Sequence, residues 1–278
     1  MSSQKEFVLF EHILKNRSIR IYFQKNIYWK YQVAIRNIFK TFHCTSVKSE
    51  QLHKGLYICY NQDVQIPIES EIHTYDVASD NWIFELLTDV EAYIINELKI
   101  TVFHGAAVCR NKHVVLIMGK RKSGKSTLTH FLVENGWNLI DDDCIYFDGE
   151  TVLGMGFPLR LRKMIYDSKM VFATCVDLDG EKRHLLSAPS YSLYAKADKV
   201  TIVFPEYARG HSFKKTVITK MQLFTMLLQN VRFSIDEKNS LKDVTQLMKT
   251  ANSGYSVVYS KCADVDFFLK ELFKDEEE

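Results

Sequence analysis

The chain has 278 residues, of which 46% are hydrophobic and 25% are charged. This is an ordinary globular composition, with enough apolar material for one or two domains. A net charge of +2 is too small to favour nucleic acid or a membrane surface as a partner, and no apolar stretch approaches the roughly 18 residues of a spanning helix.

The six cysteines are widely scattered and form no C-x-x-C pair. A zinc site or a disulfide framework is therefore not expected. We expect reduced thiols within a core instead. The first residues contain acidic and polar breaks and do not match a signal peptide. These features predict a cytoplasmic protein.

Residues 1–98 are predicted to form a β-rich segment that ends in a helix and packs on the rest of the chain. Two runs rich in aromatic and β-branched residues, Ile19–Phe23 and Ile27–Ile35, predict a hairpin around residues 24–26. A small β layer that covers a larger sheet and a peptide-docking module are both compatible with this pattern.

A second strand pair is predicted over Leu56–Tyr60 and Val64–Ile68, around residues 61–63. Pro67 in the second run indicates an edge strand. Over residues 81–98 the apolar residues recur with helical period, which predicts an amphipathic helix.

Residues 99–278 are predicted as a second domain, organised around the stretch Gly119-Lys-Arg-Lys-Ser-Gly-Lys-Ser126. This stretch matches G-x-x-x-x-G-K-[ST], the phosphate-binding P-loop. The apolar run Val114–Met118 precedes it, and a helical pattern over residues 127–135 follows. Glycines let backbone N–H groups turn inward around a phosphate, and the helix N-terminus adds a favourable dipole.

Within this motif, Lys125 is expected to reach the terminal phosphates and Ser126 to bind Mg²⁺. The residues expected at the nucleotide are Gly119, Lys122, Ser123, Gly124, Lys125, Ser126 and Thr127. The basic run Lys120–Lys122 either adds to the positive electrostatic potential at the phosphates or is exposed to solvent. A helix-opening turn without a ligand is the alternative to the whole motif.

Two strands, Thr101–Val108 and Val114–Met118, are predicted to form a hairpin before the P-loop. His104 lies on the first strand and is followed by small residues that permit close backbone approach. This hairpin can bring His104 beside the phosphates, although a lone histidine is more often a satisfied polar group.

The apolar strand Trp137–Ile140 ends in three aspartates, Asp141, Asp142 and Asp143. Enzymes with a P-loop place a metal-holding aspartate at such a position. Three adjacent carboxylates repel one another, so Mg²⁺ with a nucleotide is the economical cation. A solvated turn is the alternative.

A hairpin with an Asp-Gly turn is predicted over residues 144–153. In the run Leu159–Lys163, alternation puts Arg160 and Arg162 on one face, where they meet a phosphate or acidic substrate, or form a solvated basic edge. Residues 167–194 are weakly patterned and predict a long loop. No base-reading motif of a GTPase accompanies the fragment Asp177–Gly180.

The remaining chain predicts a strand, two helices, a strand and a closing helix, over residues 197–205, 218–231, 241–251, 255–259 and 265–273. Strands that alternate with helices around a P-loop indicate an α/β or mixed α+β class.

The order of these motifs resembles the catalytic core of the HPr kinase/phosphorylase family. The resemblance is specific over residues 101–147, where a His-Gly segment at His104, the P-loop and an Asp-Asp pair at Asp142-Asp143 follow one another, and it is loose over 100–275. The shorter HPr-kinase-like proteins are also similar, and some of them phosphorylate lasso-peptide precursors. The resemblance implies a phosphoenolpyruvate-carboxykinase-like mixed sheet and phosphoryl transfer from ATP, or another nucleoside phosphate, with Mg²⁺ to a serine hydroxyl of a peptide or protein.

Carried over by this resemblance, Asp142 is the base toward the hydroxyl, and His104 contacts that base. Asp143 lies nearer the metal, in a metal set with Ser126 and Asp142, and Lys125 is the phosphate lysine. HPr kinases are hexameric, so a homo-oligomer is allowed.

The chain departs from the family in three places: the P-loop is basic, the glycine-rich signature after the aspartates is reduced to Gly154-Met-Gly156, and the first 100 residues do not resemble the regulatory domain. HPr is therefore a doubtful substrate. A kinase of a small molecule such as free serine and a non-catalytic nucleotide-binding scaffold or sensor are the alternatives.

Overall fold

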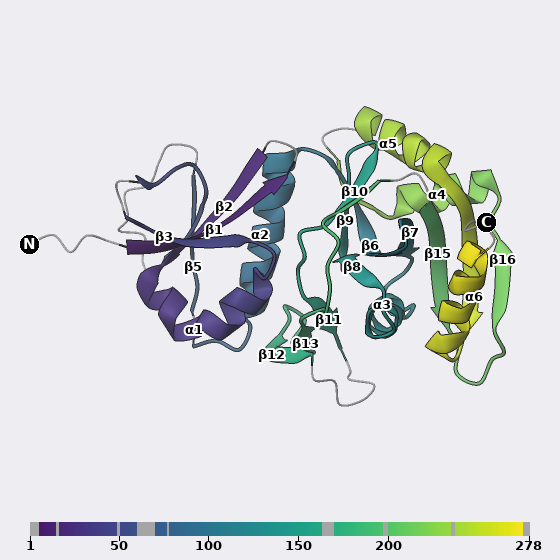
Figure 1. Cartoon of the computed structure of the whole chain (residues 1–278), viewed down its shortest axis with the longest axis horizontal. Coiled ribbons are helices and arrows are strands. Elements are labelled where there is room, and N and C mark those ends of the chain that lie inside the picture. Colours follow the sequence, from purple (N-terminus) through teal and green to yellow (C-terminus); the bar gives the residue numbers. More distant parts are fainter. Residues whose placement is uncertain are drawn as a thin grey trace, which may run out of the picture. The chain divides into compact units, whose positions relative to one another are not determined.

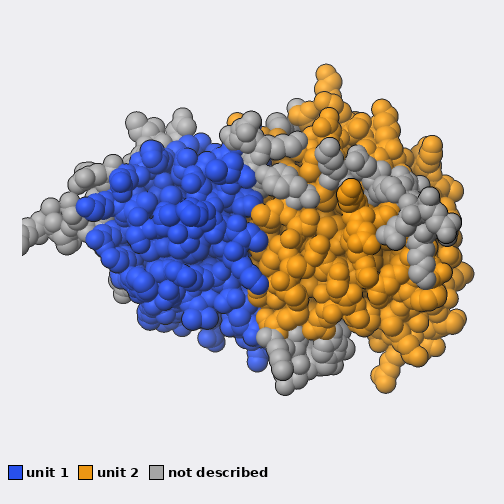
Figure 2. All heavy atoms as spheres, in the orientation of Figure 1, with its two compact units in different colours: residues 1–98, 171–185 blue, residues 99–170, 186–278 orange. Residues whose placement is uncertain are grey.

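The computed structural model describes residues 6–14, 17–48, 51–59, 70–76, 78–162, 170–196, 200–234 and 237–274. By its internal contacts the chain divides into two compact units, residues 1–98 with 171–185 and residues 99–170 with 186–278 (Figure 2). The division falls between Leu98 and Lys99, where the sequence places its domain boundary. Residues 171–185 join the first unit, which sequence patterning did not anticipate.

The first unit contains a five-stranded mixed sheet (Figure 1). Its strands, in the order β3-β1-β2-β4-β5, are β1 (Glu6–Leu14), β2 (Arg17–Gln24), β3 (His43–Lys48), β4 (Leu56–Cys59) and β5 (Glu71–Thr74). β1 is antiparallel to β2 and β3, whereas β4 is parallel to β2 and β5. Buried aromatic side chains form much of its core; the rings of Tyr22 and Tyr57 stack with centroids 4.5 Å apart.

Helix α1 (Lys25–Ile38) corrects the predicted hairpin. Residues 27–35, rich in β-branched and aromatic side chains, are helical, and residues 24–26 lead from β2 directly into the helix. The buried residues of α1 include Ile27, Ile35 and Ile38, a spacing that places them on one helical face. Burial of that face against β1 and β2 outweighs the β propensity of the segment.

Helix α2 (Trp82–Leu98) confirms the predicted amphipathic helix. The strand expected over 64–68, with its turn at 61–63 and Pro67, lies outside the described residues. The loop predicted over 167–194 is wrong in its described part, which contains β12 (Val171–Val176) and β13 (Lys182–Leu186). Between them, Asp177 accepts the N–H groups of Asp179 and Glu181, so a side chain stabilises this turn.

The second unit is built on a large mixed sheet. Its main path runs β14-β10-β9-β6-β7-β15-β18-β16, with β8 and β17 paired to β6. The strands are β6 (Thr101–Arg110), β7 (His113–Met118), β8 (Asn138–Asp141), β9 (Cys144–Phe147), β10 (Thr151–Leu153), β14 (Tyr194–Lys196), β15 (Val200–Tyr207), β16 (Lys214–Val217), β17 (Val231–Phe233) and β18 (Ala251–Tyr259). A short strand, β11 (Leu159–Leu161), also belongs to this unit.

The described part of the second unit also contains four helices: α3 (Lys125–Glu134), α4 (Lys220–Gln229), α5 (Glu237–Thr250) and α6 (Cys262–Lys274). All four confirm helices expected from hydrophobic periodicity. β15 is parallel to β7 and β18, while β6 is antiparallel to β7, so the mixed α+β class is confirmed.

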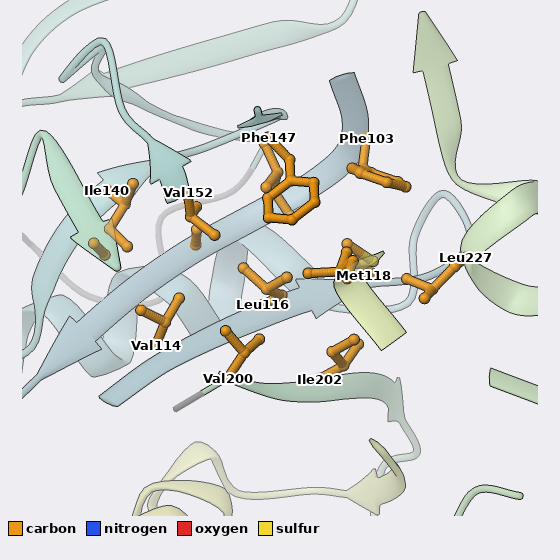
Figure 3. Packing of buried hydrophobic residues seen from close by; sticks show 14 of the residues in the cluster. Phe103, Val114, Leu116, Met118, Ile140, Phe147, Val152, Val200, Ile202 and Leu227 are labelled. Atoms are coloured by element: carbon orange, nitrogen blue, oxygen red, sulfur yellow. The ribbon is translucent and has the colours of Figure 1, made fainter. Parts of the chain in front are cut away.

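The core of the second unit lies between the sheet and two of its helices. Val114, Leu116 and Met118 of β7 belong to one buried cluster with Val200 and Ile202 of β15 (Figure 3). Leucines of α4 and α5 close the same cluster. The alternate residues of β7 point to the opposite face of the strand, and α3 packs against β6 and β7. Because β7 is buried along its whole length, the loop that follows it starts from a rigid base.

Among the described residues, no helix is long and apolar enough to cross a membrane.

Candidate functional site

The predicted P-loop is a strand–loop–helix turn whose backbone depends on residues with positive φ. Gly119 has φ +135°, Lys122 +68° and Gly124 +97°, and α3 begins at Lys125 directly after Gly124. Positive φ is accessible to glycine at little cost, which explains both glycines of the motif. The loop therefore has the winding conformation that directs backbone N–H groups inward.

Three other elements hold this loop in place. The Tyr207 N–H donates to the Ser123 carbonyl at 3.1 Å, and the Tyr259 hydroxyl donates to the Gly124 carbonyl at 3.2 Å. At the start of the loop, the Gly119 N–H donates to the Asn230 side-chain oxygen at 3.3 Å. Residues from β15, β18 and the end of α4 thus fix a loop whose two glycines would otherwise give its backbone conformational freedom.

The helix end presented by this loop suits an anion. No side chain caps the N-terminus of α3, and its first turn holds no acidic residue, so the helix dipole and its first N–H groups are not neutralised. The Ser123 hydroxyl is buried and has no hydrogen-bond partner among the described residues. A buried polar group without a partner is costly unless a ligand satisfies it.

Lys125 lies at the mouth of the loop. Its ammonium donates to the carbonyls of Gly119 at 2.8 Å and Lys120 at 3.0 Å. Burial lowers its pKa, the charges of Asp142 and Asp143 oppose that shift, and the charge of Arg162 adds to it. Lys125 is thus a cation held between the loop and the aspartates, with Arg162 close enough to affect it.

Gly124 provides a direct test of how the loop is held. We expect Gly124→Ala to lower the free energy of unfolding by several kcal/mol, because an added Cβ would clash with the Tyr259 hydroxyl and the left-handed backbone alone costs roughly 1–2 kcal/mol. Chemical denaturation measures the change.

Gly136, at the other end of α3, is the matched control, because it has φ +89° and no heavy atom near its Cβ position. Gly136→Ala should cost only the backbone strain, and Tyr259→Phe should partly restore Gly124→Ala. Equal losses for the two glycine variants would show that Tyr259 does not restrict the loop.

The three aspartates have different surroundings. β8 ends at Asp141, so Asp142 and Asp143 follow the strand. The Asp141 carboxylate is buried and accepts the N–H groups of Asp142 at 2.9 Å and Met155 at 2.7 Å. Asp141 therefore shapes the turn that presents the next two carboxylates.

Asp142 lies beside the start of α3. Its Oδ1 accepts a hydrogen bond from the Ser126 hydroxyl at 3.4 Å, and its Oδ2 accepts the Arg160 N–H at 3.1 Å. The carboxyl is buried. Burial and the neighbouring Asp143 charge raise its pKa to about 6, although Arg160 and Lys125 oppose the rise.

Asp143 lies among His104 and two arginines. Its carboxylate is 3.2 Å from His104 Nδ1, 3.1 Å from Arg232 Nη1 and 3.9 Å from Arg160 Nη1. Burial alone would raise its pKa, but the hydrogen bond to His104 and the two guanidinium groups outweigh it and lower the pKa below the usual range. The pKa values of the two adjacent carboxyls are thus driven apart, with Asp142 raised and Asp143 lowered.

His104 reaches Asp143 because of where it lies on β6. The first half of β6 pairs with β9, up to His104 opposite Cys144, and its second half pairs with β7, from Gly105 opposite Met118. A Cβ at Gly105 would lie 2.7 Å from the Ile117 carbonyl, so only glycine allows the two strands to approach this closely. His104 is held at the point where β6 changes partners, beside the start of the P-loop.

The structure brings together most of the side chains that the sequence indicates. His104, Lys125, Ser126, Asp142, Asp143 and Arg160 form one cluster. Two contacts differ from the expectation: His104 contacts Asp143 rather than Asp142, and Asp142 rather than Asp143 accepts the Ser126 hydroxyl. Thr127 lies in the first turn of α3, and Lys122 is exposed on the loop.

Four residues of the site were missed by sequence patterning: Tyr207, Asn230, Arg232 and Tyr259. Arg232 also donates to the Cys144 thiol, and the Asn230 carbonyl accepts the His104 N–H at 2.7 Å. These residues come from β15, the end of α4, β17 and β18, and no local motif marks them. The sequence did offer one signal for Arg232. The short alternating run Val231–Phe233 follows a predicted helix, which is typical of a strand, and Arg232 lies within it.

Comparisons with known proteins add little to this geometry. No protein-family model and no curated protein matches the chain. Among solved structures, the chain is similar to the HPr(Ser) kinase/phosphatase from Coxiella burnetii, with a TM-score of 0.32 and 10% sequence identity, over 64% of this chain and 99% of that chain. A likeness of this size assigns neither family nor activity, so the chemistry rests on the side chains.

Proposed function

We propose that this protein is a nucleotide-dependent phosphotransferase that phosphorylates a serine hydroxyl of a peptide or protein. The observation that carries the proposal is the contact between Asp142 and Ser126: a buried carboxylate, with a pKa raised to about 6, lies against the hydroxyl that ends a P-loop. A phosphate-binding loop alone is compatible with many reactions, whereas a carboxyl with a pKa near neutrality beside it suits proton transfer.

The residues present fit a nucleotide with Mg²⁺. The N-terminus of α3 and the buried Ser123 hydroxyl offer donors to phosphate oxygens, and Lys125 adds a positive charge. The Ser126 hydroxyl offers an oxygen ligand, which Mg²⁺ prefers, and the phosphates would supply further oxygens. The described residues contain no cluster of three or more His, Cys, Asp or Glu that could hold a metal. When bound, the metal–nucleotide would supply the phosphoryl group and neutralise its charge.

Asp142 and Asp143 have different roles in the proposed reaction. Neighbouring titratable groups whose pKa values are driven apart mark an acid/base assignment. Asp142 is largely ionised at neutral pH and can accept the proton of the acceptor hydroxyl as that oxygen attacks. Asp143 stays anionic and is too weak a base for this role. It holds His104, Arg160 and Arg232 around the site, and the two guanidinium groups can bind phosphate or an acidic acceptor.

A purely nucleotide-binding scaffold would not need this arrangement. A buried carboxyl with a raised pKa destabilises the fold at neutral pH, and a protein that only senses a nucleotide gains nothing from it. The serine acceptor is proposed from the sequence resemblance, and a free amino acid is the competing acceptor.

The proposal is tested by binding and transfer with the full chain. Calorimetry with ADP and Mg²⁺ should show one site per chain. Incubation with ATP, Mg²⁺ and a serine-containing peptide library should give phosphopeptides by mass spectrometry, and a matched library with alanine in place of serine should give none. Faster ATP turnover with free serine alone would favour a small-molecule kinase. Slow turnover that no acceptor accelerates would contradict a transferase.

A further inference from the structure

Tyr207 is an exposed aromatic residue that borders the P-loop and has no role in the chemistry proposed above. It ends β15, and 51% of its surface is exposed. Its N–H donates to the Ser123 carbonyl. A Cβ at Gly124 would lie 3.3 Å from the Tyr207 Cβ. An aromatic side chain thus emerges directly beside the phosphate-binding loop.

The ring of Tyr207 is fixed along one side. It packs edge to face on Tyr259, with centroids 5.8 Å apart and planes at 72°. Tyr259 is itself buried, and its hydroxyl donates to the Gly124 carbonyl. A ring oriented this way offers flat apolar area to a ligand at little entropic cost, because few torsions remain to be ordered.

The sheet places Tyr207 and the reactive cluster on different sides of the loop. β7, which leads into the P-loop, lies between β6 and β15. His104 lies on β6, and Asp143 contacts it, whereas Tyr207 comes from β15. A nucleotide has its reacting phosphate at one end and its base at the other. With the phosphate at the reactive cluster, the base can lie on the side of the loop where Tyr207 is.

We propose that Tyr207 is the stacking platform for the base of the bound nucleotide, and this inference rests on the proposed nucleotide-dependent function. Every base has a π face, so stacking binds the base without reading its hydrogen-bonding edge. Tyr207 therefore contributes affinity for nucleosides over bare polyphosphate, with little preference among bases beyond their stacking strength.

The test uses two probes on the full chain, ADP with Mg²⁺ and inorganic tripolyphosphate with Mg²⁺, which lacks a base. Calorimetry should show that Tyr207→Leu weakens ADP binding by about 5- to 150-fold, the range of one base–aromatic stack, and leaves tripolyphosphate binding unchanged. Tyr207→Phe should bind both probes as the parent does. These substitutions keep the backbone N–H that anchors Ser123.

Phe267→Ala is the matched control, because Phe267 is an exposed aromatic residue on α6 of the same unit; it should change neither affinity. Unchanged ADP binding in Tyr207→Leu, or equal loss of both probes, would overturn the inference and leave the P-loop assignment standing. If the parent protein binds neither probe, the proposed function fails, and the platform fails with it.

Discussion

Replacement of Asp142 by asparagine should reduce phosphoryl transfer by roughly 10²- to 10⁴-fold, the usual contribution of a general base, and leave nucleotide affinity within about tenfold. The amide keeps the shape of the carboxyl but cannot accept the acceptor's proton. Single-turnover kinetics with ATP, Mg²⁺ and the serine-containing peptide substrate separate the two effects. Full transfer activity in Asp142→Asn would remove Asp142 from the role of base.

The same substitution should stabilise the protein at neutral pH. The folded-state pKa of Asp142 is about 6, against 3.8 for an unperturbed aspartate. The folded state therefore binds more protons than the unfolded state between these values, and stability falls as pH rises through this window. The difference corresponds to about 3 kcal/mol at most. Asp142→Asn abolishes this penalty, and denaturation at pH 5 and pH 8 should show a smaller loss on raising the pH than in the parent.

Asp141→Asn is the matched control in the adjacent position. Asp141 accepts two backbone N–H groups, and an amide NH₂ cannot replace both acceptor oxygens. This variant should therefore lose stability where Asp142→Asn gains it, because Asp142 accepts only one backbone N–H and its other partner, the Ser126 hydroxyl, can accept from an amide NH₂. Loss of stability in both variants would mean that Asp142, like Asp141, mainly holds the turn.

Transfer by the parent enzyme should also depend on pH through Asp142. Activity should rise as pH increases through about 6, since only the ionised carboxyl accepts a proton. A profile that is flat between pH 5 and pH 7 would contradict this assignment.

Replacement of Lys125 by alanine should weaken the binding of ADP with Mg²⁺ by roughly 10- to 150-fold, as expected for the loss of a charge-assisted hydrogen bond. Lys125 is the cation at the mouth of the loop, bonded to the Gly119 and Lys120 carbonyls. It also lowers the pKa of Asp142, so its removal should move the rise of any residual activity to higher pH. Calorimetry and the pH profile measure the two consequences.

Lys112→Ala controls for net charge in this experiment. Lys112 is exposed in the turn between β6 and β7, and its removal changes the charge of the same unit by the same amount. It should leave ADP affinity unchanged. If Lys125→Ala also leaves that affinity unchanged, the loop from Gly119 to Ser126 does not bind nucleotide phosphates.

The parts of this site whose conformation depends only on neighbouring residues could be predicted from the sequence. The run of buried residues in β7, the glycines at 119 and 124 and the helix after Lys125 are all set by steric and hydrogen-bonding rules that act within a few residues. The same holds for the hairpin of β6 and β7 and for the end of β8 at Asp141. The P-loop could therefore be predicted together with the side chains that follow it.

Local patterning failed where distant contacts decide the conformation. Residues 27–35 favour a strand by composition, yet burial of Ile27 and Ile35 against β1 and β2 makes them helical. The turn at Asp177 is stabilised by its own carboxylate and by the ion pair with Arg183, which a search for periodicity does not detect. In the first case tertiary burial outweighs the intrinsic propensity of single residues, and in the second a local side-chain contact fixes a turn between two strands.

The sequence by itself determined the glycine loop between β7 and α3 and the residues proposed to bind phosphate and metal, because the conformation of such a loop depends on neighbouring residues. The tertiary structure decided how the carboxyls are used. Burial raises the pKa of Asp142, whereas His104, Arg160 and Arg232 lower that of Asp143. Those three side chains come from β6, β11 and β17, and their distance from a carboxylate depends on strand order, which no short stretch of sequence encodes.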